Sequence, residues 1–265
     1  MTTIQELIQT VSSAIVHLVF LRNRERISSG SGFLCSNRLI TNSHVIRFGD
    51  FETVAIRFHN SSTLDLSDAI RLSRDDFFSI VVKESPEDME DYAVLRADEP
   101  EFAGRYNFEL GSVEDVVVGQ QVVFLGFPFD SLHLTAHVGY VSSKHKTKGI
   151  NILQIDGSVN GGNSGGPMLA IESSRVAGIV TRKETGLEKQ FKELIKSLQS
   201  NQELLQQLKD RGTVSFFGLD LMGAFCASQA TMEKIVLNIE RSANVGIGYA
   251  YSAEYVARSG AFQEI

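Results

Sequence analysis

The segment GGNSGGP, residues 161–167, decides the fold, because four glycines surround a single serine, Ser164, within seven residues. Glycine lets the backbone turn sharply and approach a substrate closely, so the Ser164 hydroxyl can project from the bend. Acyl transfer needs this geometry: the serine oxygen reaches a carbonyl carbon while backbone N–H groups point at the oxygen that gains charge. A glycine-rich turn without a chemical role is the alternative interpretation of this segment alone.

Two more segments carry side chains that can serve a serine nucleophile. In LITNSHVI, residues 39–46, His44 follows an apolar strand and is flanked by small polar residues. In DYAVL, residues 91–95, Asp91 stands directly before a run of strand-forming residues. Taken alone, such a histidine is usually a turn or core residue, and an aspartate before a strand is common. The three segments together are much more specific.

Other acids lie close to Asp91. The stretch ESPEDMED, residues 84–91, contains five acidic residues, among them Asp88 and Glu90. Asp91 is preferred as the partner of the histidine because it alone precedes the apolar strand directly. Asp88 and Glu90 are expected in a solvated loop.

The pattern of apolar residues predicts a mainly β chain. From Ala14 onward, short runs rich in Val, Ile and Phe are separated by Gly, Asn, Ser and Asp. Runs of this length at close spacing indicate antiparallel strands in a sandwich or barrel. Apolar residues at helical spacing predict a short amphipathic helix over residues 3–12. A short terminal helix is expected near residues 252–258.

Residues 187–243 differ from the rest and are expected to form a largely helical insertion. Apolar residues recur at helical spacing in its first half, with a predicted break at residues 199–202. A strand is predicted at residues 213–221. A second helix follows, with Ser228 or Thr231 as its N-cap. The insertion is interpreted either as a packed decoration or as a lid, an oligomer contact or a platform for a regulatory partner.

Composition excludes several classes of function. The chain has 265 residues, 43% of them hydrophobic and 22% charged, which is ordinary for a soluble globular protein. A net charge of −7 argues against nucleic-acid binding, which needs a concentrated positive field. No glycine-rich phosphate-binding fingerprint is present, so no cofactor is expected. No metal is expected either, because five histidines lack metal-ligand spacing: His17, His59, His133, His137 and His145.

The N-terminal region and the cysteines suggest a location. The first residues carry no basic stretch and no small-residue cleavage site, so no signal peptide is predicted. The longest apolar run, residues 14–21, is too short to span a bilayer, so no membrane contact is expected. One disulfide between Cys35 and Cys226 is possible, but two buried free thiols are the preferred interpretation. We expect a cytoplasmic protein.

The motifs together resemble the chymotrypsin-like (trypsin-like) serine peptidase family, most closely its bacterial HtrA-type branch. The segments that carry the resemblance follow the family's order His, Asp, Ser, and they are SGSGFLCSNRLITNSHVI, DYAVL, LQIDGSVNGGNSGGP, VAGIVT and NVGIGYAYSAEYV. They cover residues 14–182 and 244–257. The resemblance implies two six-stranded antiparallel β-barrels with the cleft between them. Residues 1–108 would form the first barrel and residues 109–265 the second. The PDZ domains common in this branch have no counterpart in the sequence.

The resemblance also implies roles for individual residues. Ser164 is the nucleophile, His44 takes its proton and later gives it to the leaving amine, and Asp91 holds the imidazole in the right tautomer. The backbone N–H groups of Gly162 and Ser164 form the oxyanion hole. The implied activity is that of a serine endopeptidase, which hydrolyses protein or peptide substrates through an acyl-enzyme.

One departure from the family bears on activation. Secreted relatives of trypsin carry an aspartate just before the nucleophile, and it binds a new N-terminus released by cleavage. Here Asn163 takes that place and cannot form the ion pair. Activation by N-terminal processing is therefore not expected, and control by loop ordering or by a partner is.

The sequence indicates only some of the residues that would determine substrate specificity. By alignment, Ser158 lies near the base of the pocket, and Thr181, Arg182 and Lys183 follow the strand that would pair with substrate. Residues 246–249 would form another wall. No acid occupies the expected base, so a preference for Lys or Arg is disfavoured. The two cations either favour an acidic residue before the scissile bond or point into solvent.

A second class of function is kept as the alternative. The fold would then be a catalytically dormant binding or scaffold module, with the helical insertion as its interface. Pseudopeptidases usually lack a triad residue, and none is missing here. A third hypothesis combines the peptidase and the binding module: the protein is a dormant peptidase that a partner switches on.

Overall fold

The computed structural model describes residues 3–59, 65–181, 186–211, 215–216, 219–242 and 246–263. The chain divides into two compact units, one made of residues 1–182 and 246–265, the other of residues 183–245. Among the described residues, no helix combines the length and the apolar character needed to cross a membrane.

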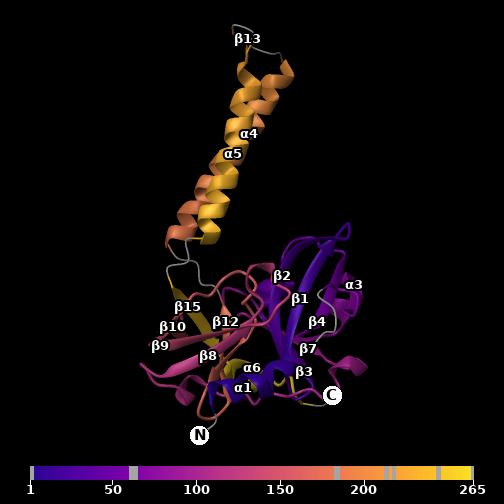
Figure 1. The fold of residues 1–265 in the computed structure, drawn as a ribbon, viewed down its shortest axis with the longest axis vertical. Coiled ribbons are helices and arrows are strands. Elements are labelled where there is room, and N and C mark those ends of the chain that lie inside the picture. Colours follow the sequence, from indigo (N-terminus) through magenta and orange to yellow (C-terminus); the bar gives the residue numbers. More distant parts are fainter. Residues whose placement is uncertain are drawn as a thin grey trace. The chain divides into compact units, whose positions relative to one another are not determined.

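The first sheet of the larger unit is antiparallel and curled (Figure 1). It follows α1 (Ile4–Val11), which begins with a capping box in which Thr3 and Glu6 satisfy each other's backbone N–H groups. The strand order is β5-β4-β1-β2-β3-β7-β6. The strands are β1 (Ile15–Arg22), β2 (Glu25–Cys35), β3 (Arg38–Thr41), β4 (Thr53–Phe58), β5 (Ile70–Ser73), β6 (Val81–Ser85) and β7 (Tyr92–Arg96), with α2 (Ser43–Ile46) after β3 and α3 (Arg74–Ser79) after β5.

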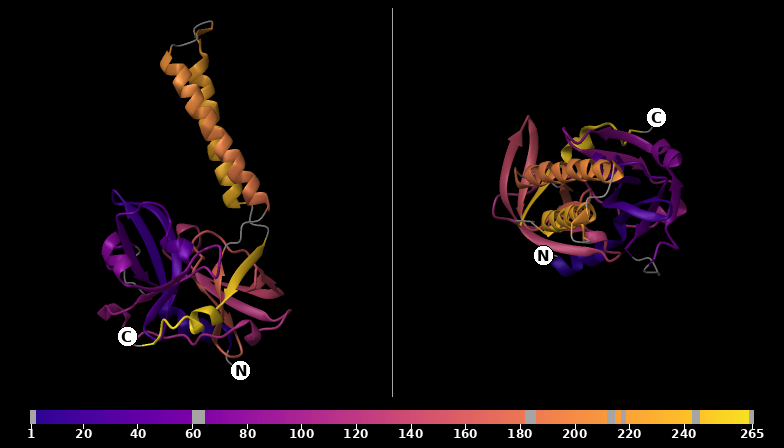
Figure 2. Two further views of the ribbon diagram at one scale, coloured as in Figure 1. Left: turned by 180° about the vertical axis from the view of Figure 1, so that it is seen from behind. Right: turned by 90° about the horizontal axis from the view of Figure 1, so that it is seen from above.

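The second sheet closes into a barrel in the order β10-β15-β12-β11-β8-β9. Figure 2 shows its strands beside the first sheet within the same unit. Its strands are β8 (Gln121–Gly126), β9 (Thr135–Thr147), β10 (Ile150–Asp156), β11 (Pro167–Ala170), β12 (Arg175–Thr181) and β15 (Ile247–Ser252), followed by α6 (Glu254–Arg258). Four short 3₁₀ turns connect elements in the described part of this unit: η1 (Ser12–Ala14), η2 (Pro100–Phe102), η3 (Val113–Asp115) and η4 (Pro128–Asp130).

A shared apolar core joins the two sheets. One cluster of buried side chains includes Phe33 and Leu39 of the first sheet together with Leu125 and Leu169 of the second. Because this cluster removes apolar surface of both sheets from water, it holds the ends of β3 and β8 in a fixed relation. The turn that carries His44 follows the end of β3, and the segment that carries Ser164 lies between β10 and β11 of the second sheet.

The predicted mainly β, trypsin-like fold with a helical insertion and short terminal helices is confirmed. The second sheet is the expected closed six-stranded barrel, whereas the first sheet has seven strands instead of six. Both cysteines are free, but only Cys35 is buried; Cys226 is half-buried, so the prediction of two buried thiols is wrong for Cys226.

The smaller unit is a helical hairpin of α4 (Gly186–Arg211) and α5 (Leu221–Ser242), with a two-residue strand pair, β13 (Ser215–Phe216) and β14 (Leu219–Asp220), between them. The predicted break at residues 199–202 is wrong: α4 continues through it, since the segment contains neither glycine nor proline, the two residues that disfavour a helix strongly. The predicted N-cap at Ser228 or Thr231 is also wrong. The Asp220 carboxylate accepts the Gly223 N–H at 2.9 Å, which starts α5 earlier.

Candidate active site

The turn that carries His44 is held by an ion pair. His44 lies in α2, directly after the buried end of β3. The neighbouring Ser43 hydroxyl donates to Glu84 at 2.6 Å, and the Arg47 guanidinium donates to both Glu84 oxygens at 2.9 and 2.5 Å. The Arg47 hydrogen bonds hold the pKa of Glu84 below its ordinary value. Glu84 belongs to β6, so Ser43 and Arg47, on either side of His44, are both held to that strand.

Asp91 is a buried aspartate just before β7, and its side chain is 1% exposed. Its φ of 49° lies in the left-handed region, which aspartate tolerates better than most residues. Two hydrogen bonds hold this backbone: the Asp91 N–H donates to Pro86 O at 3.1 Å, and the Asn42 amide donates to Asp91 O at 2.7 Å.

The carboxylate of Asp91 receives hydrogen bonds from both sheets. His44 Nδ1 lies 2.8 Å from Oδ2, and the His44 backbone N–H donates to Oδ1 at 3.1 Å. The Thr181 hydroxyl, at the end of β12, donates to Oδ2 at 3.0 Å. Because a carboxylate only accepts, the neutral His44 ring carries its proton on Nδ1, and Nε2 is free to act as a base. Asp88 is exposed, and Glu90 accepts the Ser85 hydroxyl rather than lying free in a solvated loop.

The loop that carries Ser164 is packed against the strand that leads to His44. The Ser164 carbonyl accepts the N–H of Ser31 at 2.8 Å. A Cβ on Gly165, which has φ +86°, would lie 2.1 Å from Ser31 O and 3.1 Å from Asn42 N. Only glycine fits this approach. The structure thus brings residue 164 close to the turn of residue 44, although the described hydrogen bonds include none between Ser164 Oγ and the His44 ring. That bond is often long in apo structures.

The two amides of the predicted oxyanion hole are unpaired among the described hydrogen bonds. Gly161 O accepts the Phe129 N–H at 2.8 Å. Because the peptide group is planar and trans, the N–H of Gly162 points the opposite way, away from Phe129. Gly162 has φ +97°, and a Cβ there would lie 2.1 Å from Phe127 O. The predicted donors, the N–H groups of Gly162 and Ser164, therefore have no acceptor among the described hydrogen bonds.

Ser31 is a residue that sequence reasoning missed. Its buried hydroxyl donates to Gly162 O at 2.6 Å and accepts the Phe127 N–H at 3.0 Å. Its backbone carbonyl accepts the Thr41 hydroxyl at 2.7 Å. Ser31 therefore ties the oxyanion-hole segment to β2 and β3. It stands within a quoted motif, but its hydroxyl's partners are 96 and 131 residues away, so no local signal shows this role.

The predicted specificity residues have different environments. Ser158 is exposed, while the next residue, Val159, is buried, and a Cβ on Gly248 would lie 2.4 Å from a Val159 methyl group. Thr181, expected to contact substrate, is buried with its hydroxyl on Asp91. Lys183 lies outside the described residues, and so does Arg182.

Asn163 meets a histidine instead of a cationic group. Its Nδ2 lies 3.4 Å from His137 Nε2, and the His137 ring stacks on Phe124 with centroids 4.8 Å apart. Burial lowers the pKa of His137, which favours a neutral ring that accepts from the amide. Two neutral side chains therefore meet where secreted trypsin relatives place an ion pair.

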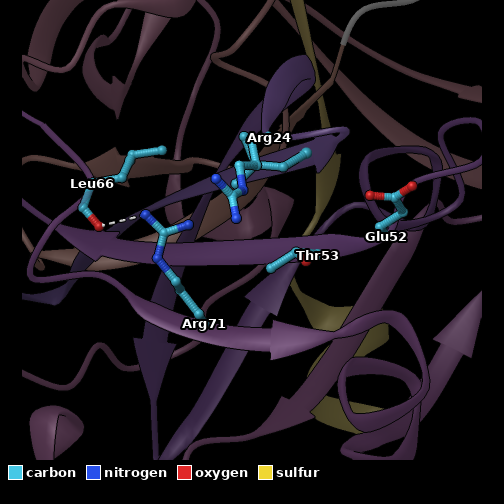
Figure 3. A pocket seen from close by; sticks show the side chains of 6 residues that line it. Arg24, Glu52, Thr53, Leu66 and Arg71 are labelled. Carbon is cyan, nitrogen blue, oxygen red and sulfur yellow. Dashed lines mark hydrogen bonds between the residues drawn. The ribbon is translucent and has the colours of Figure 1, made fainter.

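A separate pocket lies on the first sheet and shares no residue with the predicted site (Figure 3). Within it, Arg71 donates to Leu66 O at 3.1 Å. Its lining residues are Leu21, Arg24, Glu52, Thr53, Leu66 and Arg71. In the described part of the chain, no group of three His, Cys, Asp or Glu side chains has the arrangement of a metal site.

Comparison with known proteins points to one family. Residues 30–179, more than half of the chain, match the family model of the trypsin-like peptidase domain. Serine protease HTRA1B of Danio rerio is 29% identical over 197 residues, which cover 69% of this chain and 37% of that protein. Serine protease HTRA4 of Homo sapiens is 30% identical over 185 residues, covering 64% and 35%. A probable periplasmic serine endoprotease, DegP-like, of Pseudomonas fulva is 28% identical over 161 residues, covering 58% and 29%.

Solved structures agree with the fold. The HtrA-type protease AlgW with tripeptide gives a TM-score of 0.51 at 22% identity, covering 66% of this chain and 52% of that one. A second structure of this protease gives 0.53 at 21% identity, covering 69% and 56%. The chain spans about a third of the length of the curated relatives it matches.

Proposed function

The chain belongs to the trypsin-like peptidase family, and we propose that it is an HtrA-type serine endopeptidase that cleaves protein substrates with Ser164, His44 and Asp91. The observation that carries the proposal is the 2.8 Å contact of His44 Nδ1 with the buried Asp91 carboxylate, which leaves Nε2 as the base. The packing of the Ser164 loop against Ser31 and Asn42 supports the same assignment.

The mechanism follows from these groups. His44 Nε2 takes the proton as the Ser164 oxygen attacks the peptide carbonyl, and Asp91 stabilises the imidazolium that forms. The amides of Gly162 and Ser164 bind the oxyanion; a single donor of this kind stabilises the transition state by about 3 kcal/mol. His44 then protonates the leaving amine. Water, activated by the same ring, hydrolyses the acyl-enzyme.

Control without N-terminal processing is part of the proposal. Asn163 and His137 are neutral partners, so no ion pair with a new N-terminus is needed to order this loop. The hole segment is instead held by the Phe129 N–H and by Ser31. Loop ordering or a partner then sets the activity.

Unprocessed protein should cleave casein slowly by itself and faster when cell extract is added. Cleavage at the full rate by the purified protein would contradict control by loop ordering or a partner.

The test of the proposed function is a cleavage-site profile. A denatured proteome is incubated with the protein or with Ser164→Ala, and new peptide N-termini are identified by mass spectrometry. We expect new N-termini only with the unsubstituted protein, with a shared residue preference before the cleaved bond. Identical profiles for the two proteins, with and without cell extract, would overturn the proposal.

A scaffold function is the second candidate, and the exposed apolar residues of the helical hairpin favour it. In that case a partner would bind Ser164→Ala as well as the unsubstituted protein, and no substrate would turn over.

A cytoplasmic location also belongs to the proposal. Two free cysteines suit a reducing compartment, although the DegP-like relatives are named periplasmic. Cell fractionation with an antibody tests it.

A further inference from the structure

Among the residues of the helical hairpin whose exposure is described, few large apolar side chains are buried. Among its residues whose exposure is described, the buried large apolar ones are Leu198 of α4 and Val236 of α5. A hydrogen bond from Gln199 Nε2 to Glu233 Oε1 at 2.8 Å indicates the antiparallel register. In this register Leu198 and Val236 lie within one helical turn of each other along the hairpin. Figure 1 shows α4 and α5 running side by side. Two helices with so small a core are marginal by themselves.

Large apolar side chains of the hairpin stay exposed to solvent, each by 43% to 57%. Their spacing follows a heptad: Phe225, Met232 and Ile239 are seven residues apart. With 3.6 residues per turn, the positions of these exposed apolar residues around each helix axis can be compared with that of the buried residue, Leu198 in α4 and Val236 in α5. In each helix they all lie on the same side of the buried residue, within about 120° of it. Because the helices are antiparallel, both stripes fall on the same face, here called the heptad face. Its members are Leu194, Leu204, Leu208, Phe225, Met232, Ile235 and Ile239.

The heptad face carries no charge. The exposed residues between its apolar members are Ser197, Asn201, Ala224 and Ser228. Residues 186–242 contain seven basic and seven acidic residues, so the net charge of −7 belongs to the rest of the chain. Two copies that meet through this face bring no like charges together. Contact through the rest of the chain, which carries the net negative charge, would bring negative charges of the two copies together.

We propose that the heptad face binds the same face of a second copy, and that the two hairpins form a four-helix bundle. A twofold axis makes such a face self-complementary. Seven half-exposed side chains offer roughly 600 Å² per copy, so the dimer would bury about 1,200 Å², the lower limit of specific interfaces. Asn201, seven residues from both Leu194 and Leu208, is a polar residue at an a position, which fixes register and oligomer state in such bundles.

The test is the mass of the full-length protein in solution, measured by light scattering across a wide concentration range. We expect twice the 29.2 kDa chain mass for the unsubstituted protein. The double variant Met232→Glu/Ile235→Glu places four carboxylates in the dimer interface and should be monomeric. Ala227→Glu, at an exposed position on the side of α5 opposite the buried Val236, is the matched control and should remain dimeric.

Folding of the larger unit is monitored in each variant by its cooperative thermal unfolding. A protein that is monomeric at every concentration would overturn the proposal, since the face is then covered by another partner or left open. So would a dimer that persists in the double variant, or one lost equally in Ala227→Glu. None of these outcomes depends on peptidase activity, so the proposed function is tested separately.

Discussion

His44 Nδ1 and Asp91 Oδ2 are 2.8 Å apart although 47 residues separate them in the chain. The Asp91 carboxylate also receives the His44 backbone N–H and the Thr181 hydroxyl, so both sheets fix its position. A carboxylate held in this way orients the imidazole without needing to move during the reaction.

Asp91→Asn should lower kcat by about four orders of magnitude with little change in KM, because the amide can hold the wrong imidazole tautomer. Thr181→Val removes only one hydrogen bond to the same carboxylate and should cost roughly tenfold. Steady-state kinetics on a peptide found by cleavage profiling measures both. Equal effects of the two substitutions would contradict the proposed role of Asp91.

Ser31→Ala should lower kcat about tenfold or more while leaving KM nearly unchanged, because Ser31 positions Gly162 and does not contact substrate. Affinity for a peptide aldehyde, whose adduct places an oxyanion in the hole, should fall in parallel. Ser28→Ala, on the same strand, is the control and should leave both unchanged. A rise in KM at constant kcat would assign Ser31 a different role.

Gly162→Ala should destabilise the protein by about 2 kcal/mol or more, since the new Cβ meets Phe127 O at 2.1 Å and φ is +97°. Gly161→Ala is a matched control, because a Cβ there has no neighbour within 4 Å. Thermal unfolding compares the two variants. Similar unfolding midpoints would show that the loop does not have the described conformation.

His17→Phe should reduce the loss of stability in acid. Burial, together with Arg26 and Arg57, lowers the pKa of His17 to about 3, and neither ring nitrogen has a hydrogen-bond partner in the described part of the chain. The unfolded chain protonates this histidine near pH 6.5. Between about pH 3 and pH 6.5 the unfolded state binds more protons at His17 than the folded state does. The free energy of unfolding therefore falls by about 1.4 kcal/mol per pH unit as the pH drops through this range.

Phenylalanine suits position 17 because the His17 ring already stacks on Phe127, with centroids 4.5 Å apart. Urea unfolding at pH values from about 7 to 5 gives the slope for each protein. His59 and His137, whose pKa values are also lowered, keep a smaller slope in the variant. An unchanged slope would mean that His17 is protonated equally in both states.

Local motifs predicted the fold and the candidate triad, because a glycine-framed serine and residues at strand ends leave a signal in neighbouring positions. The partners of Ser31 and the bond from Phe129 N–H to Gly161 O left none, since they join segments distant in the chain. The start of α5 has a simpler cause: Asp220 lies inside an apolar run, residues 213–221, whose pattern predicts a strand and hides the N-cap.

In the proposed function, Ser164 is a nucleophile activated by His44. Intact-mass and peptide mass spectrometry after reaction with a fluorophosphonate tests it most directly. We expect a single adduct on Ser164, absent in Ser164→Ala and formed much more slowly in His44→Ala. No adduct under any condition, with cell extract included, or an adduct on another residue, would contradict it.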